Sequence, residues 1–353
     1  MLLVYLVESF DNPTSSLKFP SLAANHVYHV VSLKYSNSVA AKTACANSTD
    51  PNCYLNFRKE IIEGVDYSTE VSVDDVNSIN NRLVKLIQYL DANHASENWG
   101  QYYSVNTINW NKVATAGHSQ GGGHAAVMGI SNQLNRVLMF SSPNDYSNHI
   151  GTAATWCSSS FVTPDSVFYG FNNSHDHVVT FSSQKQVWDA MSFSTNNDTT
   201  LVDIESSPYN ESHLLYTAFQ SSGSTSENHS ATVRDSQTPI LSTGRPKYEP
   251  VWKYMLGVAD VVSSALSTAV PVLIQVFPNP TSGNLVMKGI PKGFSIIIIS
   301  DIHGKLTLRK DIFVKNSDDD STVIDVPFLR SGIYICKLLH HNGETVNFTF
   351  VRQ

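Results

Sequence analysis

The stretch that decides the fold runs from Asn111 to Gly129 and is NKVATAGHSQGGGHAAVMG. Its apolar beginning predicts a buried strand, and the small residues that follow Gly121 predict a helix packed closely on a sheet. Between them, Gly117-His118-Ser119-Gln120-Gly121 has the G-x-S-x-G pattern of a nucleophile elbow, a sharp turn that holds a serine hydroxyl exposed beside a base. Ser119 is therefore the candidate nucleophile. The alternative interpretation is a glycine-rich helix start capped by a serine.

The composition is that of a folded protein with room for two domains, since 41% of the 353 residues are hydrophobic. A formal net charge of −7 argues against nucleic acid as a partner, because no basic stripe is available to neutralise phosphates. Only 15% of the residues are charged, while serine, threonine and asparagine are plentiful, which favours a secreted protein. No segment reaches the roughly 18 consecutive apolar residues that cross a membrane.

The chain contains four cysteines: Cys45, Cys53, Cys157 and Cys336. Cys45 and Cys53 bracket a polar loop, and a disulfide between them would add about 2.5 kcal/mol to the stability by the chain-entropy argument. Two unpaired loop thiols are the other possibility, and the sequence leaves both open. No C-x-x-C or H-E-x-x-H pattern occurs, so we expect no metal site.

Short apolar runs predict a mostly parallel sheet. Met1–Leu6 is continuously apolar, as expected for a strand covered on both faces, and a second strand at Tyr28–Tyr35 follows a short helix near Leu22–Asn25. This spacing predicts a βαβ unit with a right-handed crossover. By contrast, Ser207–Pro250 has no clear periodicity. Further strands are predicted at Val137–Ser141, Ser166–Phe171 and Thr200–Ile204, and further helices at Gln184–Met191 and from Val251 onward.

The apolar start, Met1–Val7, predicts a strand rather than an export signal. It is too short for the hydrophobic region of a signal peptide, and no lysine or arginine precedes it. We therefore expect that the sequence lacks its natural N-terminus, including the first strands of the fold.

An amphipathic helix is predicted beyond residue 75. Ser72 followed by Asp75 has the spacing of a capping box. Apolar residues then recur at helical spacing, which predicts a helix lying on the sheet. These residues are Val76, Ile79, Leu83, Leu86, Ile87 and Leu90.

Composition shifts near Gly257 and predicts a second domain. Ala259–Thr268 is small and polar, as expected for a linker. Short strands at Ser295–Ile299, Thr322–Val326 and Tyr334–Leu338, separated by turn residues, predict an antiparallel β-sandwich. We expect a first domain at residues 1–257, a linker at 258–270 and the sandwich at 271–353.

A nucleophilic serine needs a base, and the base needs an orienting acid. Asp176 follows the strand that ends at Phe171, and loops at the carboxyl ends of strands carry such groups, so Asp176 is the candidate acid. Asp145, one strand earlier, is its rival. For the base, His229 lies in a polar Ser/Asn-rich loop, whereas His213 precedes an apolar run that looks packed. His229 is favoured, and His213 is the alternative.

The oxyanion of an acyl-transfer intermediate needs preorganised donors, each contributing about 3 kcal/mol in the transition state. One donor is expected from the backbone N–H of Gln120. The other is expected from the loop that follows the first strand, around Val7 to Ser9. His118 and His124 flank the serine and are interpreted as pocket-lining or structural residues.

With these residues placed, residues 1–257 resemble the lipase and esterase branch of the α/β-hydrolase superfamily. The resemblance rests on Gly117-His118-Ser119-Gln120-Gly121, on the strand order, and on Gly170 with Asp176-x-Val178. It implies Ser119 as nucleophile, Asp176 as acid and His229 as base, with no cofactor. One departure is that such enzymes usually carry His-Gly or Pro-Gly after the oxyanion strand, where this chain has Val7-Glu8.

The tail resembles the C-terminal sorting domain of the type IX (Por) secretion system of Bacteroidetes. Three motifs occur in the expected order: Val276–Gly283 (VFPNPTSG), Asp301–Lys305 (DIHGK) and Ser331–Ile335 (SGIYI). The resemblance implies an Ig-like sandwich that is recognised by the secretion machinery and usually removed, so the protein is expected to be secreted or bound to the cell surface. A carbohydrate-binding sandwich is the alternative for this segment.

Together these features predict an α/β protein that acts as a secreted serine hydrolase, most specifically a carboxylic ester hydrolase. The expected partners are a small or polymeric ester substrate and the type IX machinery. The alternative is a catalytically inactive surface or binding protein on a hydrolase scaffold, because a carboxylate at Glu8 would oppose an oxyanion.

Overall fold

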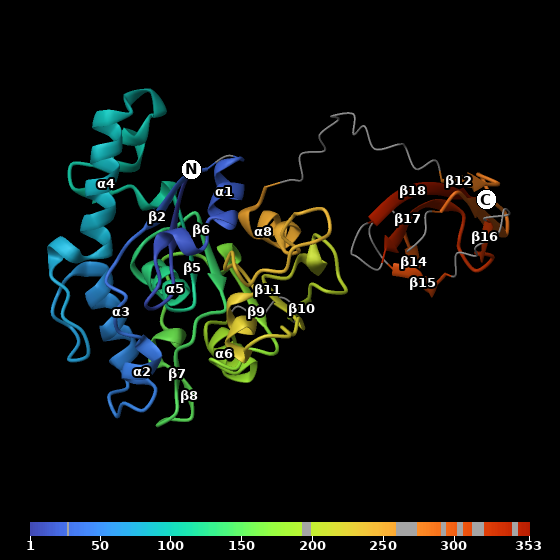
Figure 1. Ribbon diagram of the computed structural model, residues 1–353. Helices are drawn as coiled ribbons and strands as arrows, with labels where there is room; N and C mark the ends of the chain where they lie inside the picture. The colour runs from blue at the N-terminus through green and yellow to red at the C-terminus, as the bar shows by residue number, and fades with distance from the viewer. Residues whose placement is uncertain are drawn as a thin grey trace. The chain divides into compact units, whose positions relative to one another are not determined.

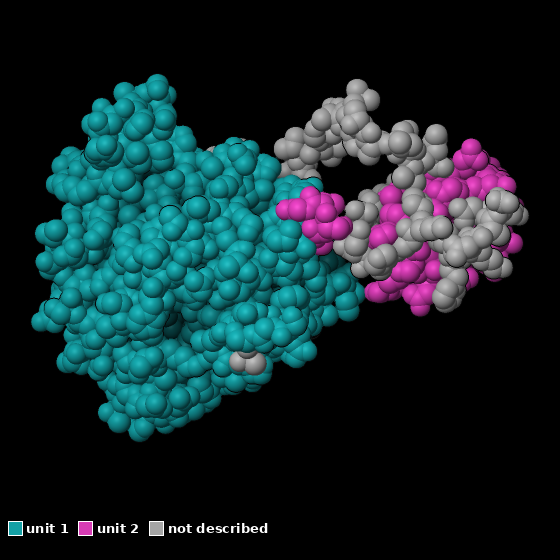
Figure 2. All heavy atoms as spheres, in the orientation of Figure 1, with its two compact units in different colours: residues 1–240, 245–260 teal, residues 241–244, 261–353 magenta. Residues whose placement is uncertain are grey.

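The computed structural model describes residues 1–26, 28–192, 199–258, 274–290, 294–301, 306–312, 321–340 and 345–353. These residues form two compact units, one comprising Met1–Ile240 with Arg245–Asp260 and the other Leu241–Gly244 with Val261–Gln353 (Figure 2). Apart from Val258, the predicted linker at 258–270 lies outside the described residues. Within the described part of the chain, no helix has the length and apolar character needed to cross a bilayer.

The first unit is built on a parallel seven-stranded sheet, which confirms the predicted α/β class (Figure 1). Its spatial order is β10-β11-β9-β6-β5-β1-β2. All five residues of β1, an interior strand next to the edge strand β2, are fully buried, as expected for a strand covered on both faces. The strands are β1 Leu2–Leu6, β2 His29–Leu33, β5 Val113–His118, β6 Arg136–Phe140, β9 Phe168–Asn173, β10 Thr200–Leu201 and β11 Leu214–Thr217.

Helices and short hairpins complete this unit. Helix α1 packs against α8, and α3 packs against α4 and α5. The helices are α1 Lys18–Ala24, α2 Ala41–Cys45, α3 Cys53–Glu63, α4 Ile79–Asn93, α5 Gln120–Ser131, α6 Phe181–Ala190, α7 Thr225–Ser230 and α8 Glu249–Leu256. Two hairpins join β3 Tyr103–Ser104 to β4 Thr107–Ile108, and β7 Tyr146–Ser147 to β8 Thr152–Ala153.

Helix α4 begins later than the sequence pattern predicted. Asp75–Asn77 forms a separate 3₁₀ turn, and the side chain of Ser78 accepts a hydrogen bond from the Asn81 N–H at 3.1 Å. Ser78 is therefore the N-cap, and the prediction that placed the cap at Ser72 was wrong. Val76 precedes the helix and is 67% exposed, whereas Ile79, Leu83 and Ile87 form the buried face.

The end of the sheet also differs from the prediction. Strand β10 covers only Thr200 and Leu201 of the expected Thr200–Ile204, and it pairs with β11. Strand β11, Leu214–Thr217, lies inside the segment that appeared aperiodic. Four residues are too few to establish an alternation, so pairing with β9 rather than local pattern defines this strand.

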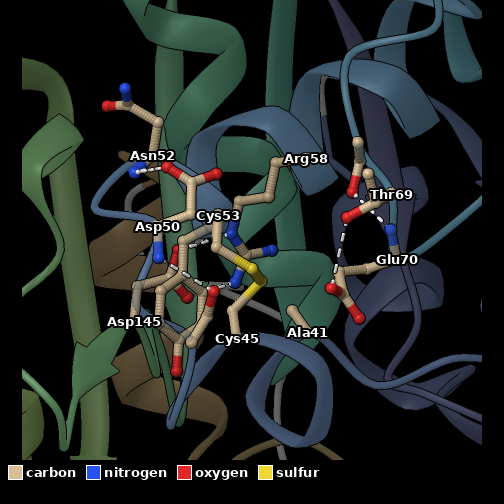
Figure 3. Close-up of a disulfide and its surroundings, with 12 residues drawn as sticks. Ala41, Cys45, Asp50, Asn52, Cys53, Arg58, Thr69, Glu70 and Asp145 are labelled. Atoms are coloured by element: carbon tan, nitrogen blue, oxygen red, sulfur yellow. Dashed lines mark hydrogen bonds and ion pairs between the residues drawn. A yellow bond between two sulfur atoms is a disulfide. The ribbon is translucent and has the colours of Figure 1, made fainter.

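A disulfide joins Cys45 at the end of α2 to Cys53 at the start of α3 (Figure 3). The structure thus decides the pairing that the sequence left open. Cys157 and Cys336 are free and buried. The bridge ties α2, which contributes to the pocket described below, to the helix that carries Arg58.

The second unit is an antiparallel β-sandwich, as predicted. One sheet has the order β12-β13-β16 and the other β15-β14-β17-β18. Their inward side chains share a core that includes Leu285, Ile297 and Leu338. The strands are β12 Gln275–Phe277, β13 Asn284–Lys288, β14 Phe294–Asp301, β15 Leu306–Asp311, β16 Ser321–Asp325, β17 Gly332–His340 and β18 Thr345–Arg352.

Candidate active site

Ser119 occupies a strained turn between β5 and α5, with φ 52° and ψ −115°. A Cβ on Gly117 would lie 2.2 Å from the carbonyl carbon of Gly121, and a Cβ on Gly121 would lie 2.1 Å from the oxygen of Leu6. The elbow therefore requires glycine at both positions. A positive φ at a non-glycine residue is costly and persists where the surrounding structure enforces it. The turn presents Ser119 at the carboxyl end of the sheet.

His229 and Asp176 meet beside this turn. The Nδ1 atom of His229 lies 2.6 Å from Oδ2 of Asp176, and both side chains are buried. Asp176 follows β9, as predicted, but His229 lies in helix α7 rather than in the loop that the sequence suggested. Because an ionised carboxylate only accepts hydrogen bonds, Nδ1 carries the proton. This leaves Nε2 as the basic nitrogen, and it has no hydrogen-bond partner among the described residues.

Asp176 is held in its ionised form. Burial of this carboxyl group opposes ionisation, but the positive character of His229 and hydrogen bonds from the His229 ring and from the main chain outweigh it and lower the pKa of Asp176. The N–H groups of Val178 and Val179 donate to Oδ1 at 2.8 and 3.2 Å. The carboxylate thus has a fixed orientation toward the imidazole.

Two amide side chains that the sequence analysis missed connect Asp176 to Ser119. Gln184 Nε2 donates to Asp176 Oδ2 and to Asn144 Oδ1, both at 3.0 Å. Asn144 Nδ2 then donates to Ser119 Oγ at 3.3 Å. Asn144 follows β6, directly before Asp145, so its position at a strand end was the available signal; Gln184, on α6, offered none.

Asp145, the rival acid, is engaged elsewhere. It forms a buried ion pair with Arg58, and Trp156 Nε1 donates to Oδ2 of Asp145 at 2.8 Å (Figure 3). The same guanidinium donates from Nη1 to the carbonyl of Gln120 at 2.9 Å. Asp145 therefore supports the start of α5 through Arg58.

His213, the alternative base, lies at the other edge of the sheet. It precedes β11, so it is at the amino end of a parallel strand, whereas Ser119 follows the carboxyl end of β5. Its ring stacks on Tyr169 at 4.2 Å, and Nδ1 lies 3.0 Å from the carbonyl oxygen of Phe168. His213 and Ser119 therefore lie at opposite ends of the parallel strands.

The two expected oxyanion donors, Gln120 and Val7, lie in different surroundings. Gln120 begins α5, where first-turn N–H groups have no intrahelical acceptor, and its side-chain Oε1 accepts from Ser9 Oγ and Ala41 N. Val7 is buried, and its carbonyl accepts from the Tyr35 hydroxyl at 2.6 Å. Its neighbours Glu8 and Ser9 line the pocket, and Val7 does not. The N–H of Val7 as second donor stays a prediction.

The carboxylate of Glu8 is paired. Its Oε1 lies 3.1 Å from Nη1 of Arg234, and its Oε2 lies 3.5 Å from Nδ1 of His118. His118 in turn faces the carbonyl of His229 with Nε2 at 3.2 Å. The Ser141 hydroxyl donates to the same carbonyl at 2.6 Å. The ion pair with Arg234 offsets the negative charge that the sequence analysis found opposed to an oxyanion.

Both histidines that flank Ser119 are buried. Burial lowers the pKa of His118 and that of His124, and the nearby cation of Arg58 lowers the pKa of His124 further. His124 packs edge-on against Tyr35, with ring centroids 5.2 Å apart. Glu8, His118 and His229 offer three potential ligand atoms within 4.8 Å of one another. The pairing of Glu8 with Arg234 and the contact of His118 with the main-chain carbonyl of His229 already account for the positions of these two side chains.

A pocket of about 440 Å³ opens over Ser119 and His229. Such a volume lies in the range of small-molecule sites. Its wall comes from the loop after β1, from α2, from the loop after β9 and from the α7 region. The lining residues outside the elbow include Glu8, Ser9, Phe10, Ala40, Ala41, Lys42, Asn144, Val178, Val179, Ser224, Ser226, Glu227, Arg234 and Gln237.

Comparison with known protein families identifies the tail. Residues 275–352 match the family described as "Secretion system C-terminal sorting domain". A secretion sorting domain is present. It indicates type IX secretion to the cell surface or extracellular space. No curated protein matches the chain.

Within the sorting domain, the first and the last of the three quoted motifs lie at strand boundaries. Val276 and Phe277 belong to β12, and Thr281 Oγ1 donates to the carbonyl of Asn284 at 2.7 Å just before β13. The last motif begins at Ser331 and enters β17. Apart from Asp301, the second motif lies outside the described residues.

Three solved structures are distantly similar. PorZ of Porphyromonas gingivalis, a surface component of a type IX secretion system, is 17% identical over 25% of this chain and 12% of its own length, with a TM-score of 0.19. A DUF3244 protein from Bacteroides vulgatus with an immunoglobulin-like β-sandwich is 18% identical over 23% of this chain and 83% of its own, with a TM-score of 0.19. A SOBER1 variant of Arabidopsis thaliana is 10% identical over 64% and 93%, with a TM-score of 0.29.

Proposed function

We propose that the first unit is a secreted serine hydrolase that cleaves carboxylic esters. The observation that carries this proposal is the 2.6 Å contact between His229 Nδ1 and Asp176 Oδ2, which leaves Nε2 without a hydrogen-bond partner at the pocket that Ser119 also lines. An exposed serine hydroxyl beside an oriented imidazole base is the requirement for acyl transfer.

In the proposed reaction, Ser119 Oγ attacks the ester carbonyl while His229 Nε2 takes the hydroxyl proton. Asp176 keeps Nδ1 protonated and stabilises the imidazolium that forms. The Gln120 N–H donates to the oxyanion, and a donor from the loop Val7 to Ser9 completes the hole. The alcohol leaves with the proton from His229. Water, activated by the same nitrogen, then releases the acyl group and regenerates Ser119. No cofactor takes part in these steps.

The domain assignment belongs to the same proposal. Residues 1–257 form the hydrolase domain, and residues 271–353 form the part that the secretion machinery recognises. This division agrees with the two separate apolar cores among the described residues.

A second candidate is a hydrolase-fold protein that binds its ligand without cleaving it. The observation in its favour is that Ser119 Oγ accepts from Asn144, while no hydrogen bond joins Ser119 to His229 among the described residues. Catalytic hydrogen bonds are often long in ligand-free enzymes and tighten when substrate binds.

Labelling with a fluorophosphonate probe tests the proposal. The wild-type protein should be labelled at Ser119, and Ser119→Ala should not be labelled. His229→Ala should slow labelling at least 100-fold, and Asp176→Asn should lower kcat on short acyl esters by about 10⁴-fold because the tautomer of the imidazole is lost.

His213→Ala is the matched control and should label at the wild-type rate. Full esterase activity in Ser119→Ala would rule the mechanism out. A folded wild-type protein that never reacts with the probe would favour the binding protein instead.

A further inference from the structure

The pocket carries an exposed aromatic side chain at its edge. Phe10 is 72% exposed and has a positive φ of 65°, although it is neither glycine nor asparagine. A non-glycine residue with this backbone conformation is uncommon, and for a bulky side chain it is strained. Solvation alone would favour turning the ring inward. The strained, exposed position therefore calls for an explanation in terms of binding.

One buried residue, Asn37, holds the loop around Phe10 in this position. The carbonyl of Asn37 accepts from the Phe10 N–H at 2.8 Å, and Asn37 Nδ2 donates to the carbonyls of Glu8 and Asp11 at 2.7 and 2.9 Å. Asn37 is only 5% exposed. Three hydrogen bonds from one buried residue thus fix the loop on both sides of Phe10. Presenting a ring in a fixed place lowers the entropic cost of binding a ligand against it.

Most of the side chains that line the pocket around Phe10 are polar or charged. The cations of the wall are Lys42, Arg58 and Arg234, and the anions are Glu8 and Glu227. Asp145 pairs with Arg58, and Asp11 pairs with Arg234 together with Glu8. The neutral polar groups include Ser9, Thr43, Ser224, Ser226 and Gln237. Because carboxylates already pair with both arginines, the wall favours an uncharged ligand over an anion, and the many hydrogen-bonding groups favour a ligand with several hydroxyls.

Apolar groups in the pocket are few and small apart from Phe10. They are Ala40, Ala41, Val178 and Val179. Beyond these side chains, a long acyl chain would contact lining residues that are polar or charged and would desolvate their polar groups. The acyl part of the substrate is therefore short.

We propose that the substrate is a short-chain acyl ester of a carbohydrate hydroxyl, an inference that rests on the proposed esterase function. A sugar ring has an apolar C–H face, which packs on an aromatic ring, and hydroxyls at its edge, which bond to polar neighbours. Phe10 supplies the first surface, and the groups around Ser224 and Gln237 supply the second. The bond that breaks joins the acyl carbon to the sugar oxygen, water supplies the hydroxyl of the released acid, and the sugar oxygen gains a proton.

Kinetics on unactivated esters tests the substrate class. We expect kcat/KM for an O-acetylated xylo-oligosaccharide to exceed that for glyceryl triacetate at least tenfold, and glyceryl trioctanoate to be cleaved more slowly still. Phe10→Ala should raise KM for the oligosaccharide about tenfold with a smaller fall in kcat, and Phe10→Trp should retain most of the preference. Tyr89→Ala, an aromatic residue that is 61% exposed on α4 outside the pocket, should change neither constant.

Two readouts separate this inference from the proposed function. If 4-nitrophenyl acetate is hydrolysed but the oligosaccharide has no advantage, or Phe10→Ala leaves KM unchanged, the substrate inference is wrong and the esterase proposal stands. If the protein neither hydrolyses any ester nor reacts with the fluorophosphonate, the function is wrong. Titration calorimetry on Ser119→Ala tests the substrate class independently of catalysis. The uncleaved oligosaccharide should bind to Ser119→Ala. It should bind to the Ser119→Ala/Phe10→Ala double variant at least tenfold more weakly. No binding to Ser119→Ala overturns the inference.

Discussion

At the scale of single residues, the environment of Ser119 depends on amides as well as on the histidine. Asn144 reaches the serine hydroxyl, and Gln184 fixes the orientation of the Asn144 amide by donating to its oxygen. Because Gln184 also donates to Asp176, one side chain touches both the acid and the residue that holds the nucleophile. The arrangement orients Ser119 Oγ.

Asn144→Ala tests this arrangement. Removing one neutral hydrogen bond costs about 1 kcal/mol, so we expect kcat on a short acyl ester to fall roughly fivefold to tenfold with little change in KM. Gln184→Leu should produce a fall of similar size, because the Asn144 amide is then free to rotate. Steady-state kinetics with thermal melting of each variant checks the expectation. Wild-type kcat in both variants would show that the amides have no part in turnover.

At the scale of elements, the N-terminus of α4 shows how a local pattern can mark the wrong residue. The capping-box spacing of Ser72 and Asp75 predicted a start that the helix does not use. The chain makes a 3₁₀ turn at Asp75–Asn77, so the first free N–H groups of the helix fall after Ser78. The cap position thus follows from where the 3₁₀ turn ends and the α-helix begins.

Replacement of the two serines distinguishes them. Ser78→Ala removes the side-chain acceptor for the Asn81 N–H, and we expect the free energy of unfolding to fall by about 1 kcal/mol. Ser72→Ala, at an exposed position before the turn, should change it by less than 0.5 kcal/mol, roughly the limit for ordinary surface substitutions. Urea denaturation measures both. Equal losses of unfolding free energy in the two variants would contradict the assignment of Ser78 as the N-cap.

Asp203 connects the edge strand β10 to the end of β11. It accepts from Thr217 Oγ1 at 2.6 Å, from Ala218 N at 2.7 Å and from Lys247 Nζ at 2.6 Å. Burial opposes ionisation of Asp203, but these hydrogen bonds outweigh it and lower the pKa of its carboxyl below 3.8. The ionised form therefore stabilises the edge of the sheet.

A lowered carboxyl pKa gives a definite sign to the pH dependence. The stabilisation by Asp203 is fully present above the pKa of the unfolded chain and is lost as the pH falls through the lower, folded-state value. We therefore expect Asp203→Asn to be less stable than wild type at pH 7 and the difference to shrink as the pH falls below about 4. Urea midpoints measured from pH 7 to pH 3 test this. A difference that grows on acidification would contradict the assignment.

At the scale of the whole molecule, the described residues contain two separate apolar cores. One lies around the parallel sheet and the other between the two sheets of the sorting domain. Each core has its own hydrophobic driving force, which is the condition for a unit that folds by itself. We therefore expect the sorting domain to unfold without dismantling the sheet that holds Ser119.

Calorimetry should accordingly show two unfolding transitions. Val137→Ala, in the first core, should lower the midpoint of one transition only. Leu338→Ala, in the second core, should lower the midpoint of the other transition only, by an amount equivalent to about 2–5 kcal/mol, as is usual for a buried leucine. Both side chains are fully buried. If either substitution shifted both transitions equally, the units would be folding as one.

The sequence predicted those parts of the fold that short stretches specify. Met1–Leu6 is a continuous apolar run, and the predicted Val137–Ser141 is apolar up to Phe140; β1 and β6 lie there. The structure has strands at the three sites predicted in the tail as well. Strand β11 was not predicted because its existence depends on pairing with β9. The role of Gln184 was not predicted because it depends on which residues α6 covers.

By itself, the sequence determined the elbow, the class of the main sheet and the sorting domain, because glycine spacing, apolar runs and turn motifs act on residues close together in the chain. Only the tertiary structure decided which groups meet at Ser119. It brought His229 to Asp176 across 53 residues, turned Asp145 to Arg58 across 87, and set Arg234 against Glu8. It also put His213 at the opposite edge of the sheet. Such contacts depend on strand order and direction, which no local pattern encodes.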